Sequence, residues 1–214
     1  MRTSPRRSAR SPLHARFRRL FAAALALACL CGAAPRAGAS DSGGRASIAA
    51  ETDILSFFIS GYSGIVNVSF ANGLQFAAGT GRYDLPSFLL EGDEHYDEAK
   101  WEATSTSVQV ARLTYRFHGP MKNGPALGIV GLHQNMRLSS APLDGDTKFR
   151  VLNVGVTGGW YQHFGRHFYV YPTVASTNNS VLSGDPSVGG TPYKVERWAP
   201  NASLHIGWEW ELSR

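Results

Sequence analysis

Cysteine is scarce in this chain of 214 residues, and its two cysteines, Cys29 and Cys31, both lie within the first 40 residues. The rest of the chain therefore has no thiol for a disulfide framework or a cysteine-based zinc site. Acidic residues are absent from that first segment, which contains eight of the 21 basic residues. From Ser40 onward, 13 basic residues stand against 16 acidic ones, a formal charge of −3 where the whole chain has +5. This distribution excludes a basic nucleic-acid-binding domain after Ser40.

Long apolar runs and clustered glycines are also missing after residue 40. No segment there has 18 consecutive apolar residues, so no membrane-spanning helix is expected. The 23 glycines are spread over the chain and form no phosphate-binding loop, and we expect no cofactor. Gly155, Gly158 and Gly159 lie close together, and they predict either tight strand curvature or the packing of a bulky neighbour.

Residues 1–39 are predicted to be a signal peptide that is cleaved after Ala39. An arginine-rich segment precedes a short apolar stretch, Leu20 to Ala34, and then the small residues Ala37-Gly38-Ala39. This order is typical of a secretory signal, and the apolar stretch is shorter than the roughly 20 residues that span a bilayer. The Arg18-Arg19 pair leaves open whether export follows the general or the twin-arginine route. Residues 40–214 are then expected to form one domain.

The mature chain consists of short segments rich in β-branched and aromatic residues, separated by clusters of Gly, Pro, Asn and Asp. In several of them apolar residues alternate with polar or small ones, which is the period of a strand with two unlike faces. The last is the most regular, with six apolar residues from Ala202 to Leu212 opposed by six polar or small residues from Asn201 to Glu211. The alternating segments are 65–71, 73–83, 150–162, 166–176 and 201–212.

Other segments alternate less regularly. In 104–117, Val108 shares its face with Arg112, so a bulge or a change of phase is expected. Segment 125–138 is predicted to be a strand, and 191–198 is the candidate for an eighth strand. Residues 51–62 fit either a short helix or the start of the first strand. The tight turns include 71–73, with the Asn-Gly pair favoured by primed hairpin turns, and 164–166.

Residues 86–101 interrupt the strand pattern. Pro86 is suited to the first turn of a helix, and a short helix followed by an exposed acidic loop is expected. The acids lack the alternating spacing of a calcium-binding loop. The five acids of this segment are Glu91, Asp93, Glu94, Asp97 and Glu98.

About eight strands with one apolar face predict an all-β fold, an antiparallel up-and-down β-barrel. The apolar face could point inward, as in a soluble barrel, or outward toward lipid. The second face is rich in Gly, Ser, Thr and Asn, which suits a narrow polar lumen, and this favours the membrane barrel. Aromatic residues at strand ends, such as Tyr115, Tyr161, Trp208 and Trp210, suit the bilayer interface.

Three segments resemble a known group of proteins: GYSGIVNVSFANGLQFAAGTGRYDLPSFLL at 61–90, VLNVGVTGGWYQHFGRHFYVYP at 151–172 and ASLHIGWEWEL at 202–212. They look like small, largely uncharacterised bacterial outer-membrane β-barrel proteins. The resemblance covers most of 55–212 and implies an outer-membrane location. It also implies an alternating last strand, closed by an aromatic residue, that the outer-membrane insertion machinery recognises. Here Ser213-Arg214 follow that strand, which departs from the pattern.

Two groups of residues are candidate sites of chemistry. His163 and His167 flank the 164–166 turn and could hold a metal ion, although no third ligand is evident and a polar pair is favoured. Ser203, His205 and Glu209 share one face of the last strand, as in a serine hydrolase. On a single strand, residues two and four apart are about 7 and 14 Å apart, too far for a proton relay. Catalysis is therefore not expected.

We expect these polar residues instead to pair inside the lumen, since buried charges must find partners. The expected members of this network are Arg112, Arg116, Arg137, His205, Glu209 and Glu211.

The sequence thus predicts a structural or interaction-type barrel with a lumen filled by side chains. The alternatives are an outer-membrane lipid-modifying enzyme, an acyl hydrolase or transferase centred on His205, and a soluble periplasmic barrel that binds a small apolar ligand. The expected partners are outer-membrane lipid, the insertion machinery and an external ligand at loops 86–101 and 178–192, but not nucleic acid.

Overall fold

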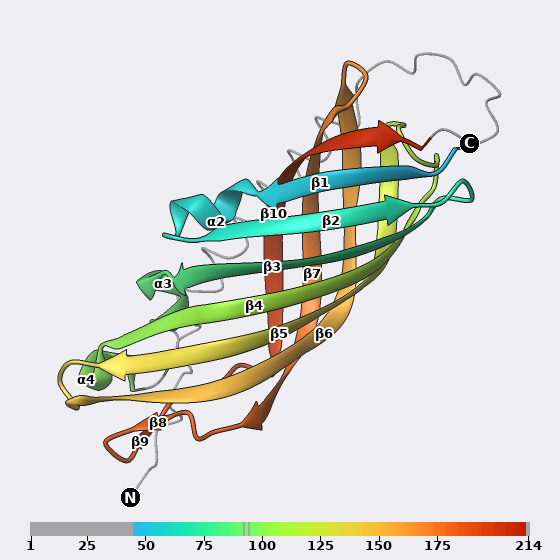
Figure 1. Cartoon of the computed structure of the whole chain (residues 1–214). Coiled ribbons are helices and arrows are strands. Elements are labelled where there is room, and N and C mark those ends of the chain that lie inside the picture. Colours follow the sequence, from blue (N-terminus) through green and yellow to red (C-terminus); the bar gives the residue numbers. More distant parts are fainter. Residues whose placement is uncertain (1–44, 92, 94, 213–214) are drawn as a thin grey trace, which may run out of the picture.

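A computed structural model describes residues 45–91, 93 and 95–212. They form a closed barrel of eight antiparallel strands, in which each strand pairs with the next along the chain and the last pairs with the first (Figure 1). The predicted all-β, up-and-down barrel is therefore confirmed. The predicted signal peptide, residues 1–39, lies outside the described residues.

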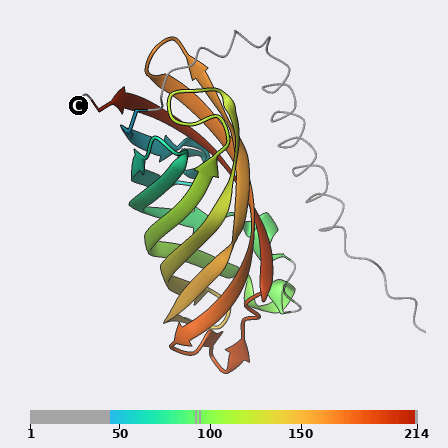
Figure 2. The same ribbon diagram turned by 90° about the vertical axis from the view of Figure 1, so that its right-hand side faces the viewer.

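The strands differ greatly in length, from seven residues in β1 to 20 in β6. The barrel strands are β1 Ser47–Asp53, β2 Tyr62–Ser69, β3 Leu74–Leu85, β4 Trp101–Arg116, β5 Gly124–Ser140, β6 Gly145–Phe164, β7 Phe168–Ser183 and β10 Trp198–Glu211. Two short strands, β8 Ser187–Val188 and β9 Thr191–Pro192, pair only with each other. Figure 2 shows the long strands inclined to the barrel axis.

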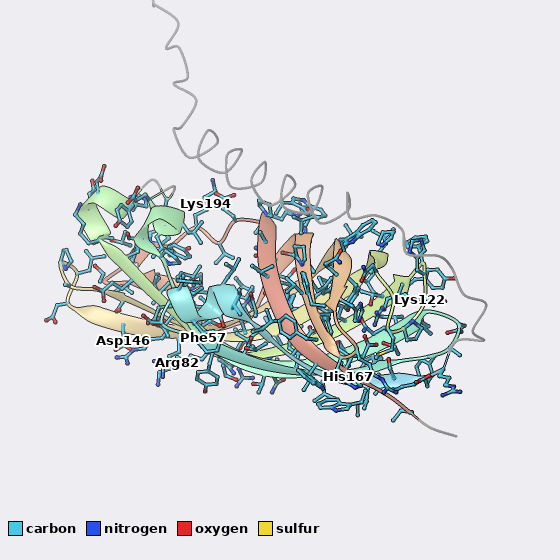
Figure 3. All side chains as sticks on the ribbon, turned by 90° about the horizontal axis from the view of Figure 1, so that it is seen from above. Phe57, Arg82, Lys122, Asp146, His167 and Lys194 are labelled. Carbon is cyan, nitrogen blue, oxygen red and sulfur yellow. The ribbon has the colours of Figure 1, made fainter. Side chains whose placement is uncertain are left out.

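The two ends of the barrel have different connections. One end, here called the turn end, has the connections 70–73, 117–123 and 165–167. The opposite end, the loop end, has four connections, three of which are longer than any at the turn end. These contain the short helices α2 Ile54–Phe58, α3 Ser87–Leu90 and α4 Tyr96–Ala99, the turn 141–144 and the β8–β9 hairpin. Figure 3 labels Lys122 and His167 near the turn end and Phe57, Asp146 and Lys194 toward the loop end.

The hairpin predicted at 71–73 is confirmed, but its turn is not of the primed type. Gly73 has φ +89°, whereas Asn72 does not have a positive φ. A primed two-residue turn of type I′ needs positive φ at both central residues, so a three-residue turn with a left-handed glycine forms instead. The side-chain oxygen of Asn72 stabilises it by accepting from the backbone N–H of Leu74 at 3.0 Å.

Two strand predictions need correction. Residues 191–198 do not form a barrel strand, because only 191–192 are extended, in the β8–β9 hairpin, and Trp198 already begins β10. The eighth barrel strand is β1, which ends at Asp53, where the sequence left helix and strand open. Both alternatives hold in part, because α2 follows immediately.

The irregularity expected in 104–117 is confirmed. The pairing of β4 with β5 shifts between Ser105 and Ser107, so that one extra residue is inserted into β4. The bulge changes which residues face inward, because Ser105 is buried on one side of it and Val108 on the other. Val108 and Arg112 both follow the bulge, so regular alternation places them on the same inward face.

The outer wall changes character along the barrel axis. Near the turn end, the cross-strand rows of β3 to β6 are apolar, and exposed Phe76, Leu113, Ile129 and Val156 form one such row. Toward the loop end the next rows contain polar and then charged residues. We call the outward apolar rows the apolar band; on β3 to β6 they comprise Leu74, Phe76, Ala78, Ala111, Leu113, Tyr115, Leu127, Ile129, Val154 and Val156.

The inner wall changes in the opposite sense. At the loop end the barrel encloses an apolar cluster in which Leu138 is fully buried. The loops that cover it are held by Asp93, which accepts from Trp101 Nε1 at 3.1 Å and from the backbone N–H of Lys194 at 2.9 Å. The segment 86–101 is therefore two short packed helices and not merely a short helix with an exposed acidic loop. The loop-end cluster comprises Leu90, Ala99, Trp101, Ala103, Met136, Leu138, Phe149, Val151 and Val188.

Candidate functional site

The turn-end half of the interior is polar, and Glu209 of β10 is one of its two centres. Its carboxylate accepts from Arg116 Nη1 of β4 at 2.8 Å and from the hydroxyl of Ser47 of β1. Nε2 of His163 of β6 donates to the other oxygen at 2.8 Å. Glu209 is fully buried, and these bonds connect four strands across the lumen.

Glu51 of β1 is the second centre. It is paired with Arg112, whose Nη2 lies 2.7 Å from Oε1, and it accepts from the hydroxyl of Tyr169 at 2.7 Å. Nδ1 of His205 lies 3.5 Å from the same carboxylate. Arg112 also donates to Asn67 at 3.2 Å, so the guanidinium joins β4 to both β1 and β2.

Two tyrosines fill the space between these centres. The rings of Tyr161 and Tyr171 stack with centroids 3.9 Å apart and an interplanar angle of 9°. Arg116 lies over the Tyr161 ring at 4.0 Å and Arg112 over the Tyr171 ring at 5.1 Å, so the pair is enclosed between two cations. Such contacts strengthen when water is excluded. The stack therefore fills part of the space between the two centres, and its rings contact both guanidinium groups.

Glycines at two positions leave room for these rings. A Cβ on Gly207 would lie 2.4 Å from Tyr169 Cζ, and one on Gly159 would lie 2.7 Å from Tyr171 Cε2. The expectation that the glycines at 155–159 pack against a bulky neighbour therefore holds for Gly159. Gly158 is different, because a Cβ there would meet nothing closer than 3.5 Å.

The two centres balance in charge, with two carboxylates facing two guanidinium groups. A buried charge is tolerated only when it is paired and hydrogen-bonded, and each of these four groups has both kinds of partner. The pairing therefore allows all four charges to be buried inside the barrel.

The structure places four of the six expected network members in this interior: Arg112, Arg116, His205 and Glu209. The expectation for Arg137 was wrong. Its side chain points outward and its Nε contacts Asp146 at 3.0 Å on the exposed surface of β5 and β6. The expectation for Glu211 also needs correction, because it lies at the rim and pairs with Arg45 at 3.3 Å.

Ser203, His205 and Glu209 do not form a catalytic triad. His205 lies against Glu51, whereas Glu209 is bound by Arg116, His163 and Ser47. A serine nucleophile needs a histidine to accept its proton. Ser47, the serine that contacts Glu209, donates to the carboxylate instead.

His163 and His167 both contact Glu209, but through different atoms of that residue. His163 binds the side chain of Glu209, and His167 Nδ1 contacts the backbone carbonyl of Glu209 at 2.8 Å. Within residues 45–91, 93 and 95–212, no group of three His, Cys, Asp or Glu side chains is placed to hold a metal ion.

Several members of the interior were missed from the sequence. Glu51 fell in a segment that was ambiguous between helix and strand, and Tyr161 was assigned to the bilayer edge although it is buried inside. The alternation of segment 150–162 was the available signal. Tyr161 alternates in phase with Thr157, whereas Val156 and Trp160 lie on the apolar face that was expected to point outward. The other missed members are Ser47, Asn67, Ser69, Gln75, Thr114, His163, Tyr169 and Tyr171.

No helix in the described part of the chain is long and apolar enough to cross a bilayer. No family model matches the chain, and no curated protein matches it.

Three solved structures are similar in fold. The N-terminal β-barrel domain of OprF from Pseudomonas aeruginosa has a TM-score of 0.48 and 13% identity, covering 79% of this chain and 100% of that one. Neisserial surface protein A has a TM-score of 0.41 and 15% identity, with coverages of 78% and 95%. A major outer membrane protein from Thermus thermophilus has a TM-score of 0.40 and 12% identity, with coverages of 78% and 98%.

Proposed function

We propose that the chain is an outer-membrane β-barrel protein of structural or interaction type, with an interior closed by its own side chains. The observation that carries this proposal is the apolar band around a polar interior. Ile129 and Val156 are more than half exposed on the outer wall, while Glu209 and Thr114 are buried inside. Lipid is the solvent that favours an apolar exterior of this kind.

The height of the apolar band supports a bilayer. On β6 the outward apolar residues run from Trp160 to Leu152, one row beyond the named rows of the apolar band at each end, and these two residues are eight positions apart. At about 3.3 Å a residue and a tilt near 40°, these Cα atoms are roughly 20 Å apart along the barrel axis. The side chains at both edges extend this toward the approximately 25 Å of an outer-membrane apolar zone.

Aromatic residues lie at the two edges of the band. Near the turn end, Tyr115, Phe117 and Trp208 are exposed, and near the loop end Phe58 and Trp198 are exposed. Amphipathic rings are favoured at the level of lipid headgroups. The partners that follow are outer-membrane lipid and the machinery that inserts barrels, and the loop end is the surface for an external ligand.

A closed interior supports a structural role. An eight-stranded barrel is narrow enough for side chains to fill it, and Tyr161, Tyr171 and Arg116 are each almost fully buried. We expect no conductance above background when the purified protein is added to a planar bilayer. Stable ion-conducting steps would contradict the closed interior.

The two other interpretations have less support. A soluble barrel that binds an apolar ligand needs an apolar interior along its whole length, whereas here Glu51, Arg112 and Glu209 lie inside. An acyl-transferring enzyme needs a serine or histidine relay, and the contacts of His205 run to Glu51.

The test is fractionation of the bacterial host. We expect the protein in outer-membrane fractions, resistant to alkaline extraction, with unboiled and boiled samples migrating differently on a gel. The mature N-terminus should be Ser40 if cleavage follows Ala39. Recovery in the soluble fraction would overturn the membrane proposal.

A further inference from the structure

In the first row beyond the apolar band that contains charged residues, all of the charged residues are cations. On the outer wall, Asn135 of β5 is paired with Arg150 of β6, which is paired with Ser183 of β7. Arg82 of β3 is exposed next to the β4 irregularity that borders the same row. One row further toward the loop end, Arg137 is paired directly with Lys148.

These cations are poorly neutralised by the protein itself. Arg137 contacts Asp146, but within the part of the chain that the structure describes, Arg82, Lys148 and Arg150 have no acidic group within 4.0 Å. Like charges directly opposite each other on neighbouring strands are unfavourable, as for Arg137 and Lys148. An external anion would remove that penalty.

A hollow of about 420 Å³ lies at the same place. Its polar lining consists of Thr106, Asn135, Lys148, Arg150 and Ser183. Two cations on one strand, with neutral amide and hydroxyl groups on the neighbouring strands, match a phosphate, which accepts several hydrogen bonds and carries negative charge.

We propose that this hollow binds the phosphate of a lipid headgroup in the leaflet at the loop end, with Lys148 and Arg150 as the charged contacts. This inference rests on the proposed membrane function. It follows from position, because Leu152, the next outward residue on β6 toward the turn end, is apolar and lies directly beside the apolar band, although its row also contains Gln109 and His133. A lipid whose acyl chains lie along the band brings its phosphate to the level of Arg150.

A membrane lipid is a better occupant than a free anion for a physical reason. Each basic residue near an anionic membrane surface strengthens binding roughly fivefold, and two do so about thirtyfold. A soluble phosphate has no acyl chains to hold it against the apolar band, so it lacks the second part of the interaction.

The experiment compares phosphatidic acid with phosphatidylcholine of the same acyl chains. Wild-type barrel in dodecyl maltoside micelles is incubated with each lipid, and retained lipid is measured by native mass spectrometry. The test variant is K148Q/R150Q. The matched control K100Q/K194Q removes the same charge from two exposed residues of the loop-end cover, away from the hollow. A second variant, K148R/R150K, keeps the charge.

We expect the wild type to prefer phosphatidic acid, K148Q/R150Q to bind it about thirtyfold more weakly, and the other two variants to stay within about twofold of wild type. Equal binding by K148Q/R150Q, or an equal loss in K100Q/K194Q, would overturn the inference. Displacement of the lipid by an equal concentration of inorganic phosphate would also overturn it, by identifying a site for free anions.

Insertion is measured separately, by alkali resistance and by the shift between boiled and unboiled samples. If the wild type does not insert into vesicles, the proposed function fails and the lipid site fails with it. If all variants insert alike and lipid preference does not change, only the lipid site fails.

Discussion

The two halves of the barrel interior solve the same packing problem with opposite chemistry. In the turn-end half, Arg116 and Glu209 are buried as an ion pair beside stacked tyrosines. In the loop-end half, Leu138 and Trp101 are buried in an apolar cluster under two short helices. The outer wall has the opposite polarity to the interior: it is apolar around the charged half and charged around the apolar half.

The difference teaches that the surroundings decide which face is polar. On the part of the wall that we propose to face lipid, Ile129 points outward and the buried charged groups inside are paired with one another. Where the wall meets water, Arg137 points outward and the interior becomes an ordinary hydrophobic core. One chain therefore contains both an interior of paired charges and an ordinary hydrophobic core.

The largest expected effect is the loss of one partner in the charged half. Arg116→Met leaves Glu209 buried with only Ser47 and His163, and it should lower the free energy of unfolding by about 3–5 kcal/mol. Urea unfolding of the protein in vesicles, followed by tryptophan fluorescence, measures this change.

The double variant R116M/E209M serves as the control. Removal of both charges should restore at least part of the stability, because no uncompensated carboxylate remains. A double variant as unstable as R116M would show that Arg116 acts through its packing on Tyr161 and not through its charge.

In the apolar half the expected cost comes from a cavity. Leu138→Ala should lower the free energy of unfolding by about 3 kcal/mol, because Leu138 is fully buried among nine clustered side chains. The same urea titration measures it. A loss well below about 1 kcal/mol would mean that the loop-end cluster is not a cooperative part of the fold.

The outer wall offers a paired test of the membrane boundary. Ile129→Arg puts a charge in the apolar band and should cost between about 2 and 3 kcal/mol, whereas Asn135→Arg on the same strand should cost less than about 1 kcal/mol. Both residues point outward on β5. Equal costs, measured by the folded fraction in vesicles across a urea series, would contradict a boundary between them.

The smallest effect is expected at the exposed pair of the loop-end half. Arg137→Gln removes a surface ion pair with Asp146 in which both side chains are at least 40% exposed, and it should change the unfolding free energy by less than about 1 kcal/mol. The temperature at which the folded form is lost from unboiled gel samples, compared between wild type and variant, is sufficient to detect a larger effect. Such an effect would place Arg137 in a buried network after all.

Much of the wall could be predicted from the sequence because strand alternation is a local signal. In β10, β6 and β7 the outward residues Trp208, Val156 and Val170 were assigned correctly from parity alone. β1 was missed because Ala49 and Ala50, which point to opposite faces, are the same residue type, so the sequence does not distinguish the two faces there. Residues 191–198 misled because Tyr193 and Val195 alternate, but they pack on the loop-end cluster.

The site could be predicted only in part, for a reason that the two halves make clear. A polar face was equated with the lumen, which is valid for Arg112 and Arg116 but fails for Arg137, where the outer wall is no longer apolar. Partners such as Glu51 and Arg112, 61 residues apart, follow from barrel closure and cannot be read from local spacing.

The contacts of Glu209 also bear on how the barrel closes in the correct alignment. Strand β10 must join β1, which lies at the opposite end of the chain, and Ser47 meets Glu209 across 162 residues. A slip of one residue would turn every side chain of β10 to the other face. Glu209 and His205 would then lie on the outer, apolar wall, while Trp208 and Trp210 would crowd the tyrosines inside. The charged half therefore favours the correct register of β10, because a one-residue slip would break its ion pairs.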